Sequence, residues 1–485
     1  MKVKSFFNSI KNISIIAILT GLFMALSFLF NGSAFLSLYH ILGQISEIKN
    51  ISYISVVVAY LVQCLGMALY GMLVKKAPVL TNRPAFSCGI LALEMLSVSL
   101  CMMTNEPGQA IICDMILNFF IGMNSGDYLT ALSKYIPYGI RGTVFGTASG
   151  IGSVGSWLIT LMGPDNFFIS RSVLIVYAAI FILNTAVVCL SAYFKAARNE
   201  TEEKRTETMQ DSAPTLKISV LVLSAVIITL FGAVHEMSAY FPLADEVNYS
   251  NTKEFARAFY AITLVAAGII NDLRRQLGGI ICTVLLVMPF VFLALKGYYS
   301  NAFVILIISY LVIGFYSVFR AISFADYASE YASYGFIAVG GLFFGRLGEA
   351  AGFGTSTFFE DNVIALVLVN VLLYIATIVL FACQQYLMGP KGLVSGVVKT
   401  KVEIEGEENR TSPLEKFSAN YGLSAREVEV LEQILAGKSN NEISEALFIS
   451  GNTVKFHMKN ILKKTECANR TELISMYEHK NRVSE

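Results

Sequence analysis

The feature that most constrains this chain is a succession of apolar stretches, each about as long as a bilayer is thick. A helix that crosses the hydrocarbon core needs about 20 mainly apolar residues, and it satisfies its own backbone hydrogen bonds inside lipid. The chain is therefore predicted to be all-α, with a polytopic bundle of membrane helices. We expect twelve spans, near residues 13–38, 52–74, 85–105, 108–133, 140–162, 170–194, 216–233, 255–270, 278–295, 301–322, 334–353 and 361–386.

Charge is unevenly distributed along the 485 residues. Hydrophobic residues make up 55% of the chain and charged residues 15%, whereas an ordinary globular chain is about 25% charged. The last 99 residues nevertheless contain 14 Lys and Arg and 14 Asp and Glu. This contrast excludes a soluble single-core protein, a disordered chain and a disulfide-bonded secreted scaffold. It predicts a membrane domain followed by a soluble tail.

The positions of Lys and Arg predict the orientation in the membrane, because cytoplasmic loops carry an excess of basic residues. With the N-terminus in the cytoplasm, the cytoplasmic segments of the membrane domain collect sixteen Lys and Arg and the opposite side five. An even number of spans then returns the C-terminus to the cytoplasm. The expected location is the inner (cell) membrane, multi-pass, with both termini cytoplasmic.

The membrane part divides into two sets of six spans, residues 1–194 and 216–386, separated by a charged cytoplasmic loop at 195–215. Glycines recur at four-residue spacing in the fifth and eleventh spans. This spacing lets helices approach closely in lipid and suggests an internal repeat, although glycine is also simply common in membrane helices. Twelve spans in a 6+6 arrangement with a charged middle loop resemble the major facilitator fold, which implies two six-helix bundles around a central cavity.

Ionisable side chains inside spans are costly, so each is a candidate for function. In a facilitator-like bundle, spans one, four, seven and ten line the cavity, and polar residues on three of them predict a small-molecule pocket. The alternative interpretation is that these side chains cap or pack helices. Arg346 and Glu349 of the eleventh span are expected to form a buried ion pair between the halves. The candidate ligand-binding residues are Asp114, Asn118, His235, Glu236, Tyr310 and Tyr316.

The charged tail predicts a linker at 387–413, where Gly, Pro and charge mix without a helical period, and a small domain at 414–485. Four short helices are expected in this domain, because capping boxes and apolar faces recur along it. Two short helices joined by a tight turn, the second of them basic, are the helix-turn-helix arrangement. The signals are capping boxes at 424–427 and 439–442, a basic helix at 451–464 and a further helix start at 469–472.

The basic helix gathers positive charge on one face, where Lys455, Lys459 and Lys463 recur every four residues. Contacts to phosphates and base edges in a major groove need such charge, although a run of charge can also be a solvated face. The surrounding sequence closely resembles the LuxR-type helix-turn-helix. The matching stretches are Leu423-Ser-Ala-Arg-Glu-Val-Glu-Val-Leu431, Gly437-Lys-Ser-Asn-Asn-Glu-Ile443, Leu447-Phe-Ile-Ser450, Thr453-Val-Lys-Phe-His457 and Asn469-Arg-Thr-Glu472.

This resemblance implies transcriptional regulation, with the helix of residues 453–464 in the major groove. By position, Lys455, Phe456 and Lys459 are expected to face bases, and Thr453, His457 and Lys463 to face phosphates. In the LuxR family the last helix commonly mediates dimerisation, and the candidates for that contact are Leu473, Ile474 and Tyr477.

The two parts together predict a membrane-bound, one-component transcriptional regulator, in which a transporter-like domain senses a small molecule and the tail binds promoter DNA. The alternatives are a functional transporter with an autoregulatory DNA-binding tail, and a tail that serves only as a protein-interaction module. The expected partners are double-stranded promoter DNA, an unidentified small molecule, the lipid bilayer, a second copy of the chain and RNA polymerase. No enzyme signature, cofactor motif or metal-ligand spacing is found, so we expect neither catalysis nor a bound cofactor or metal.

Overall fold

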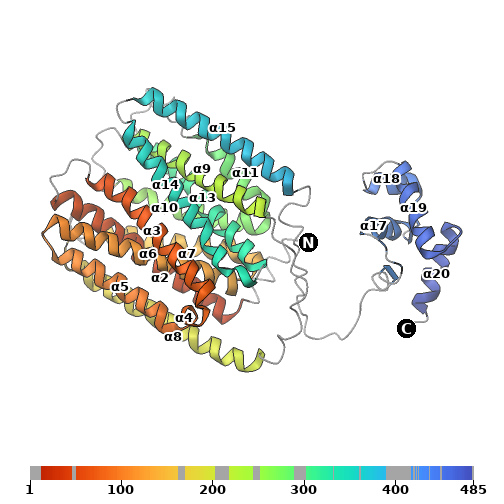
Figure 1. Cartoon of the computed structure of the whole chain (residues 1–485), viewed down its shortest axis with the longest axis horizontal. Helices are drawn as coiled ribbons and strands as arrows, with labels where there is room; N and C mark the ends of the chain where they lie inside the picture. Colours follow the sequence, from red (N-terminus) through yellow and green to blue (C-terminus); the bar gives the residue numbers. More distant parts are fainter. Residues whose placement is uncertain are drawn as a thin grey trace. The chain divides into compact units, whose positions relative to one another are not determined.

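The computed structural model describes most of the chain, and all regular secondary structure in the described residues is helical. The all-α prediction is confirmed. The chain divides into two compact units, residues 1–396 and 397–485 (Figure 1). The described residues are 13–45, 51–161, 170–202, 218–243, 252–288, 302–330, 332–359, 362–388, 417–418, 421, 423, 425–435, 437–447 and 451–482.

The first unit is a bundle of long helices, with α15 along one edge against α9 (Figure 1). Every predicted span overlaps a helix of the described residues. The helices are α2 (Ile15–Ile45), α3 (Ile51–Lys76), α4 (Pro78–Thr81), α5 (Pro84–Met103), α6 (Pro107–Tyr135), η1 (Tyr138–Ile140), α7 (Arg141–Leu161), α8 (Val173–Glu202), α9 (Ile218–Leu243), α10 (Thr252–Leu273), α11 (Arg275–Leu285), α13 (Ala302–Glu330), η3 (Ala332–Val339), α14 (Gly340–Phe358) and α15 (Val363–Met388).

Eight of the described helical segments are long and apolar enough to cross a membrane, and they lie in α2, α3, α5, α8, α9, α13, η3 with α14, and α15. Two shorter apolar helices, Ala258–Leu273 and Arg275–Leu285, lie in α10 and α11. The remaining predicted spans, α6 and α7, are long enough but contain many polar or small residues. The length and composition of the eight helices support a membrane bundle. The twelve-span, 6+6 arrangement stays a prediction.

The bundle carries apolar side chains on its outside and many polar side chains inside. On α15, Ile364 and Leu372 are 75% and 67% exposed, whereas Glu94 of α5 and Asn118 of α6 are completely buried. Lipid tails are as apolar as leucine, so helices in a bilayer associate through close packing and polar contacts. This distribution of side chains therefore suits a lipid environment.

Glycines bring helices of the bundle into backbone contact at two places. Gly146 of α7 lies against the backbone of Leu264 on α10, and Gly348 of α14 lies against the backbone of Thr229 on α9. A Cβ atom at either glycine would overlap the neighbouring carbonyl oxygen. Since only glycine lacks this atom, the predicted role of the glycines in the fifth and eleventh spans, close helix approach, is confirmed.

A buried set of charges links α7 of the first half to α10, α11 and α13 of the second. The Asp326 carboxylate accepts a hydrogen bond from Arg141 Nη1 at 2.5 Å and lies 2.8 Å from Arg275 Nε. Arg275 Nη1 also pairs with Asp272 at 2.6 Å. Asp272 in turn accepts hydrogen bonds from two backbone N–H groups at the start of α7, where a negative charge stabilises the helix. We call Arg141, Asp272, Arg275 and Asp326 the charged junction.

The second unit contains the four predicted short helices, around a small apolar core. The linker and Ser424 of the first capping box lie outside the described residues. The helices are α17 (Ala425–Leu435), α18 (Asn440–Leu447), α19 (Gly451–Thr465) and α20 (Arg470–Arg482). The core residues Val430, Leu431, Ile434, Ile443, Val454, Ile461 and Leu473 are completely buried.

The capping box predicted at the start of α18 is confirmed. The Ser439 backbone N–H donates to Glu442 Oε2 at 2.7 Å, and the Glu442 N–H donates back to Ser439 Oγ at 3.4 Å. The hydrogen bonds from the Ser439 backbone and hydroxyl lower the pKa of the Glu442 carboxyl below its usual value. At the start of α20, Asn469 Oδ1 accepts the Glu472 N–H at 2.9 Å. Both helices therefore begin where the sequence signals predicted.

Candidate functional site

Helix α19 presents one exposed face of basic side chains. Val454 and Ile461 are buried in the core of the second unit, and this anchoring decides which side of the helix faces solvent. Lys455, Lys459 and Lys463 are exposed. Because residues four apart lie one above the other on a helix, the three ammonium groups form a single stripe. An exposed stripe of positive charge on a short helix can contact nucleic-acid phosphates.

The remaining predicted DNA-contact residues lie on the same helix. Phe456 is 60% exposed, unusually for so large an apolar side chain. Its ring lies 5.6 Å from the ring of His457, and Thr453 and His457 are half-buried. The structure therefore brings all six predicted residues onto α19. Their individual roles toward bases or phosphates stay predictions.

Two polar contacts hold α19 and α20 to α17. Lys464 Nζ pairs with the buried carboxylate of Glu427 at 2.7 Å. Arg470 Nη2 donates to the backbone carbonyl of Ile434 at 3.2 Å and to that of Lys438 at 2.5 Å, at the end of α17. Lys464 therefore differs from the other lysines of α19, because its charge is neutralised within the domain. This agrees with its absence from the predicted DNA contacts.

The expected dimer contacts on α20 divide between the core and the surface. Leu473 is completely buried among α17 and α19 side chains. The prediction that it contacts a second copy of the chain is therefore wrong. It lies on the inner face of α20. The Tyr477 ring packs 5.2 Å from the ring of Phe417, and Ile474 is half-buried. Any contact with a second copy through this helix would use its outer face.

The first unit contains a cavity of about 260 Å³. Its walls come from α2, α3, α6 and α7 on one side and from α10, α13 and α14 on the other. Aromatic rings and hydroxyl groups form most of the wall. Two arginines, Arg320 of α13 and Arg346 of α14, also line it.

The predicted pair Asp114 and Asn118 lies beside this cavity but does not line it. The two share one face of α6, and Asn118 Nδ2 donates to Asp114 Oδ1 at 2.9 Å. Asn118 Oδ1 accepts a hydrogen bond from Gln63 Nε2 at 2.7 Å. Gln63 is a lining residue of the cavity. The pair is therefore connected to the cavity through one side chain.

The other four ligand candidates fall into two further places. His235 Nδ1 lies 3.7 Å from Glu236 Oε1, and the His235 ring stacks on Tyr316 at 6.3 Å. Tyr310 packs against Tyr260, with ring centroids 5.5 Å apart. None of the six candidates is among the residues that line the cavity. A pocket formed by these six residues stays a prediction.

Arg320 is a site residue that the sequence interpretation missed, because it was counted among the cytoplasmic loop cations. Its side chain is only 7% exposed and pairs with Glu349. Arg346 Nη1 pairs with the other oxygen of Glu349 at 2.6 Å. The expected buried Arg346–Glu349 pair is thus confirmed, but it lies within α14 and not between the halves. We call Arg320, Arg346 and Glu349 the arginine cluster. A basic residue inside the apolar stretch 301–322 was the available signal.

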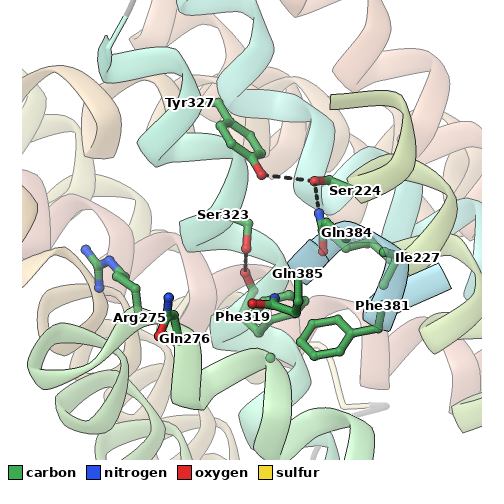
Figure 2. A pocket seen from close by; sticks show the side chains of 12 residues that line it. Ser224, Ile227, Arg275, Gln276, Phe319, Ser323, Tyr327, Phe381, Gln384 and Gln385 are labelled. Atoms are coloured by element: carbon green, nitrogen blue, oxygen red, sulfur yellow. Dashed lines mark hydrogen bonds between the residues drawn. The ribbon is translucent and has the colours of Figure 1, made fainter. Parts of the chain in front are cut away.

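Two other hollows are less suited to a polar ligand. The cavity drawn in Figure 2 has a volume of about 30 Å³, room for about one water. Figure 2 shows Ser224 hydrogen-bonded to Tyr327 at 3.0 Å and to Gln384 at 2.5 Å, which ties α9 to α13 and α15. A larger groove of about 720 Å³ between α3 and α9 is almost entirely apolar. In the described residues no group of His, Cys, Asp or Glu is arranged to hold a metal ion.

Comparison with known proteins identifies the second unit. Residues 422–477 match the family of bacterial regulatory proteins of the LuxR type. Over 52 residues the chain is 56% identical to the transcriptional regulatory protein YhcZ of Bacillus subtilis, and over 53 residues 51% identical to the CsgBAC operon transcriptional regulatory protein of Escherichia coli. Over 61 residues it is 46% identical to the transcriptional regulatory protein LiaR of Bacillus subtilis.

These matches are confined to the tail. They cover 11%, 11% and 13% of this chain and 24%, 24% and 28% of the three relatives, so the chain spans about a quarter of the length of the curated relatives it matches. The helices α17 to α20, the basic face of α19 and the family match agree. The C-terminal unit of this chain therefore carries a helix-turn-helix DNA-binding domain of the LuxR family of transcriptional regulators.

Proposed function

We propose that this protein is a membrane-bound, one-component transcriptional regulator. Its first unit senses a small molecule, and its LuxR-type tail binds promoter DNA in the cytoplasm. The observation that carries the proposal is that a single polypeptide joins a cavity-containing bundle, with eight membrane-capable helices in its described residues, to a helix-turn-helix domain with an exposed basic face. The domain limits that we propose are 1–194, 195–215, 216–386, 387–413 and 414–485.

The DNA contacts of the proposal lie on α19. Lys455, Phe456 and Lys459 face bases, while Thr453, His457 and Lys463 contact phosphates. The exposure of the three lysines and of Phe456 supports this assignment. A helix of this width fits a major groove, where lysines can reach phosphates and guanine acceptors.

The test compares transcripts between the parent strain and a strain whose chromosomal copy carries Lys455→Glu and Lys459→Glu. We expect the regulated genes to change as they do in a deletion strain, because two attractive charges become repulsive toward phosphates. Lys438→Glu is the control, since it reverses a charge of the same domain outside α19. Unchanged transcripts in the double variant, together with normal protein levels, would overturn the proposal.

The inner-membrane location with cytoplasmic termini is part of the same proposal, because the tail must reach the chromosome. The location of the tail is tested with a cysteine added after Glu485. Its labelling by a membrane-impermeant thiol reagent is compared between intact cells and inverted vesicles. Labelling of intact cells would place the tail outside and refute regulation by DNA binding. Partnership with a second copy and with RNA polymerase follows from the proposal and is testable by cross-linking in cells.

The rival function, a transporter whose tail regulates its own gene, is favoured by the cavity of the first unit. Uptake into vesicles that contain the purified full chain separates the two functions. The variant Asp114→Asn sharpens the comparison, because Asp114 contacts Asn118 beside the cavity. Loss of uptake in this variant with intact DNA regulation supports the transporter.

A further inference from the structure

The cavity of the first unit contains a concentration of positive charge. Both arginines of the arginine cluster line it. Arg320 comes from α13 and Arg346 from α14, and their side chains are 7% and 25% exposed. The larger value makes Arg346 the more accessible of the two guanidinium groups to a bound molecule. Among the described residues that line the cavity there is no Asp or Glu.

Neighbouring side chains hold both guanidinium groups in place. Each donates its Nη1 to a different oxygen of Glu349. The Arg346 guanidinium carbon lies 4.5 Å from the ring centre of Tyr60, and that of Arg320 lies 4.7 Å from the ring centre of Tyr316. An ion pair at one edge and an aromatic ring on one face fix the plane of each guanidinium. Such pre-organisation favours planar, bidentate recognition of an anion.

Several buried polar atoms around this cavity have no hydrogen-bond partner in the described part of the chain. They include Nε of Arg320, Nε of Arg346, Oδ1 of Asn31 and Oγ of Ser149. All four side chains line the cavity. Buried polar groups are normally hydrogen-bonded, so such a gathering needs an explanation. An anion can accept hydrogen bonds from the two arginines and from the Ser149 hydroxyl, whereas the Asn31 oxygen needs a donor elsewhere on the ligand.

The arginine cluster itself carries more positive than negative charge, with two guanidinium groups to one carboxylate. Glu236 lies against His235 on α9 and is not among the described lining residues. An uncompensated charge in a membrane bundle is expensive unless it has a partner. The cavity therefore favours an anion over a neutral or cationic molecule.

The rest of the wall describes the body of that ligand. The rings of Phe28, Phe35, Tyr60, Tyr128, Phe145 and Tyr260 line the cavity. Its volume of about 260 Å³ corresponds to roughly nine waters, at about 30 Å³ each. A small molecule with an aromatic or aliphatic body matches these dimensions, and a large lipid or nucleotide does not.

We propose that the cavity binds a small organic carboxylate, whose anionic group pairs with Arg346 and Arg320 and whose apolar body packs among the aromatic rings. This inference rests on the proposed function, because it names the class of molecule that the first unit senses. It places the ligand at side chains different from the six residues that sequence analysis selected.

The test uses the full chain in lipid nanodiscs and its single tryptophan. Trp157 follows the lining residue Ser156 on α7 but does not itself line the cavity, so binding is measured by isothermal titration calorimetry, with Trp157 fluorescence as a second readout. The probes are benzoate, phenylacetate and hexanoate, each compared with its neutral amide and with benzylamine. We expect a saturable change with at least one carboxylate at millimolar concentration. Its affinity should exceed that for its amide by at least tenfold.

Variants connect the response to the arginine. Arg346→Gln should weaken carboxylate binding at least tenfold. Arg346→Lys should weaken it less, because lysine keeps the positive charge but cannot donate two parallel hydrogen bonds to the carboxylate. Asn31→Asp adds a negative charge to the wall without removing an arginine, and it should weaken binding as well. Arg83→Gln, an exposed arginine before α5, is the matched control and should bind as the parent does. Size-exclusion profiles show whether each variant is folded.

Three results would overturn the inference: no carboxylate gives a saturable response, the amides or benzylamine bind equally well, or a folded Arg346→Gln chain binds carboxylate as the parent does. Because the binding readout needs no DNA, its failure is distinguishable from failure of the proposed function. A chain that regulates transcription but binds no carboxylate refutes only this inference. A chain that binds carboxylate but leaves transcripts unchanged refutes only the regulation.

Discussion

The two units of this chain expose opposite kinds of side chain, although each buries an apolar core. In the first unit the charged junction and the arginine cluster are inside, and apolar side chains such as Leu372 are outside. In the second unit the apolar residues Val454 and Ile461 are inside, and Lys455 and Lys459 are outside. Both units are all helical, so the difference does not come from secondary structure.

The difference teaches which force holds each unit together. In water, burying apolar surface contributes about 25 cal/mol per Å², which stabilises the core of the tail. In lipid that contribution vanishes between helices, and close packing at glycines and polar contacts replace it. Substitutions of the same chemical type should therefore have different effects in the two units. The following predictions use hydrogen exchange on the full chain in nanodiscs, which reports each helix separately.

The largest effect is expected at the charged junction. Asp326→Asn removes the carboxylate charge that faces Arg141 and Arg275. Two buried guanidinium groups then lose a counter-ion, which costs about 3–5 kcal/mol. Amides of α7, α11 and α13 should exchange faster in this variant. Glu106→Gln changes an exposed carboxylate before α6 and should leave exchange unchanged. Unaltered protection in Asp326→Asn would show that the junction contributes no stability.

The second effect compares the same substitution in both units. Leu473→Ala opens a cavity in the core of the tail, where the side chain is 0% exposed, and should cost about 2–5 kcal/mol. Leu372→Ala shortens a side chain that faces outward on α15 and should change stability by about 0.5 kcal/mol or less. Amide exchange in α17 to α20 measures the loss of stability in Leu473→Ala, and exchange in α15 measures it in Leu372→Ala. Equal losses would contradict the assignment of different environments.

A smaller effect is expected at two helix ends in the tail. Gly437 and Glu466 both have left-handed backbones, with φ of 79° and 57°. Side chains disfavour this conformation by about 1–2 kcal/mol. Gly437→Ala should therefore destabilise the end of α17 by about that amount, and Glu466→Gly should stabilise the end of α19 by about 0.5–1 kcal/mol. Faster amide exchange at the end of α17 in the first variant and slower exchange at the end of α19 in the second would confirm the prediction. A change in the same direction in both variants would refute it.

The smallest effect is a pH dependence of α18. Hydrogen bonds from Ser439 lower the pKa of Glu442 in the folded tail. The capping contribution is therefore fully present above the unfolded pKa of glutamate and is lost as the pH falls through the lower folded value. Glu442→Gln should remove this pH dependence from the exchange of α18 amides, after correction for intrinsic rates. If the exchange of α18 amides in Glu442→Gln depends on pH as it does in the parent, the Glu442 carboxylate does not stabilise the start of α18.

Much of the fold was predictable from local sequence, because apolar stretches and capping boxes are local signals. Every predicted span overlaps a helix, and α18 and α20 begin at their predicted caps. The basic face of α19 was also predictable, since its lysines recur with the helical period. The cavity was less accessible to such reasoning. Asp114 and Asn118 contact one another as their spacing predicts, but only tertiary packing shows that Gln63 lies between them and the cavity.

The sequence by itself determined the helices, the contrast between an apolar bundle and a charged tail, and the LuxR-type motif, because each depends on residues close together along the chain. Tertiary structure alone decided which charges far apart along the chain meet in the interior. Arg320 and Glu349 are 29 residues apart, and Arg141 and Asp326 are 185 apart. No periodic pattern connects such distant residues, because their contact depends on how whole helices pack.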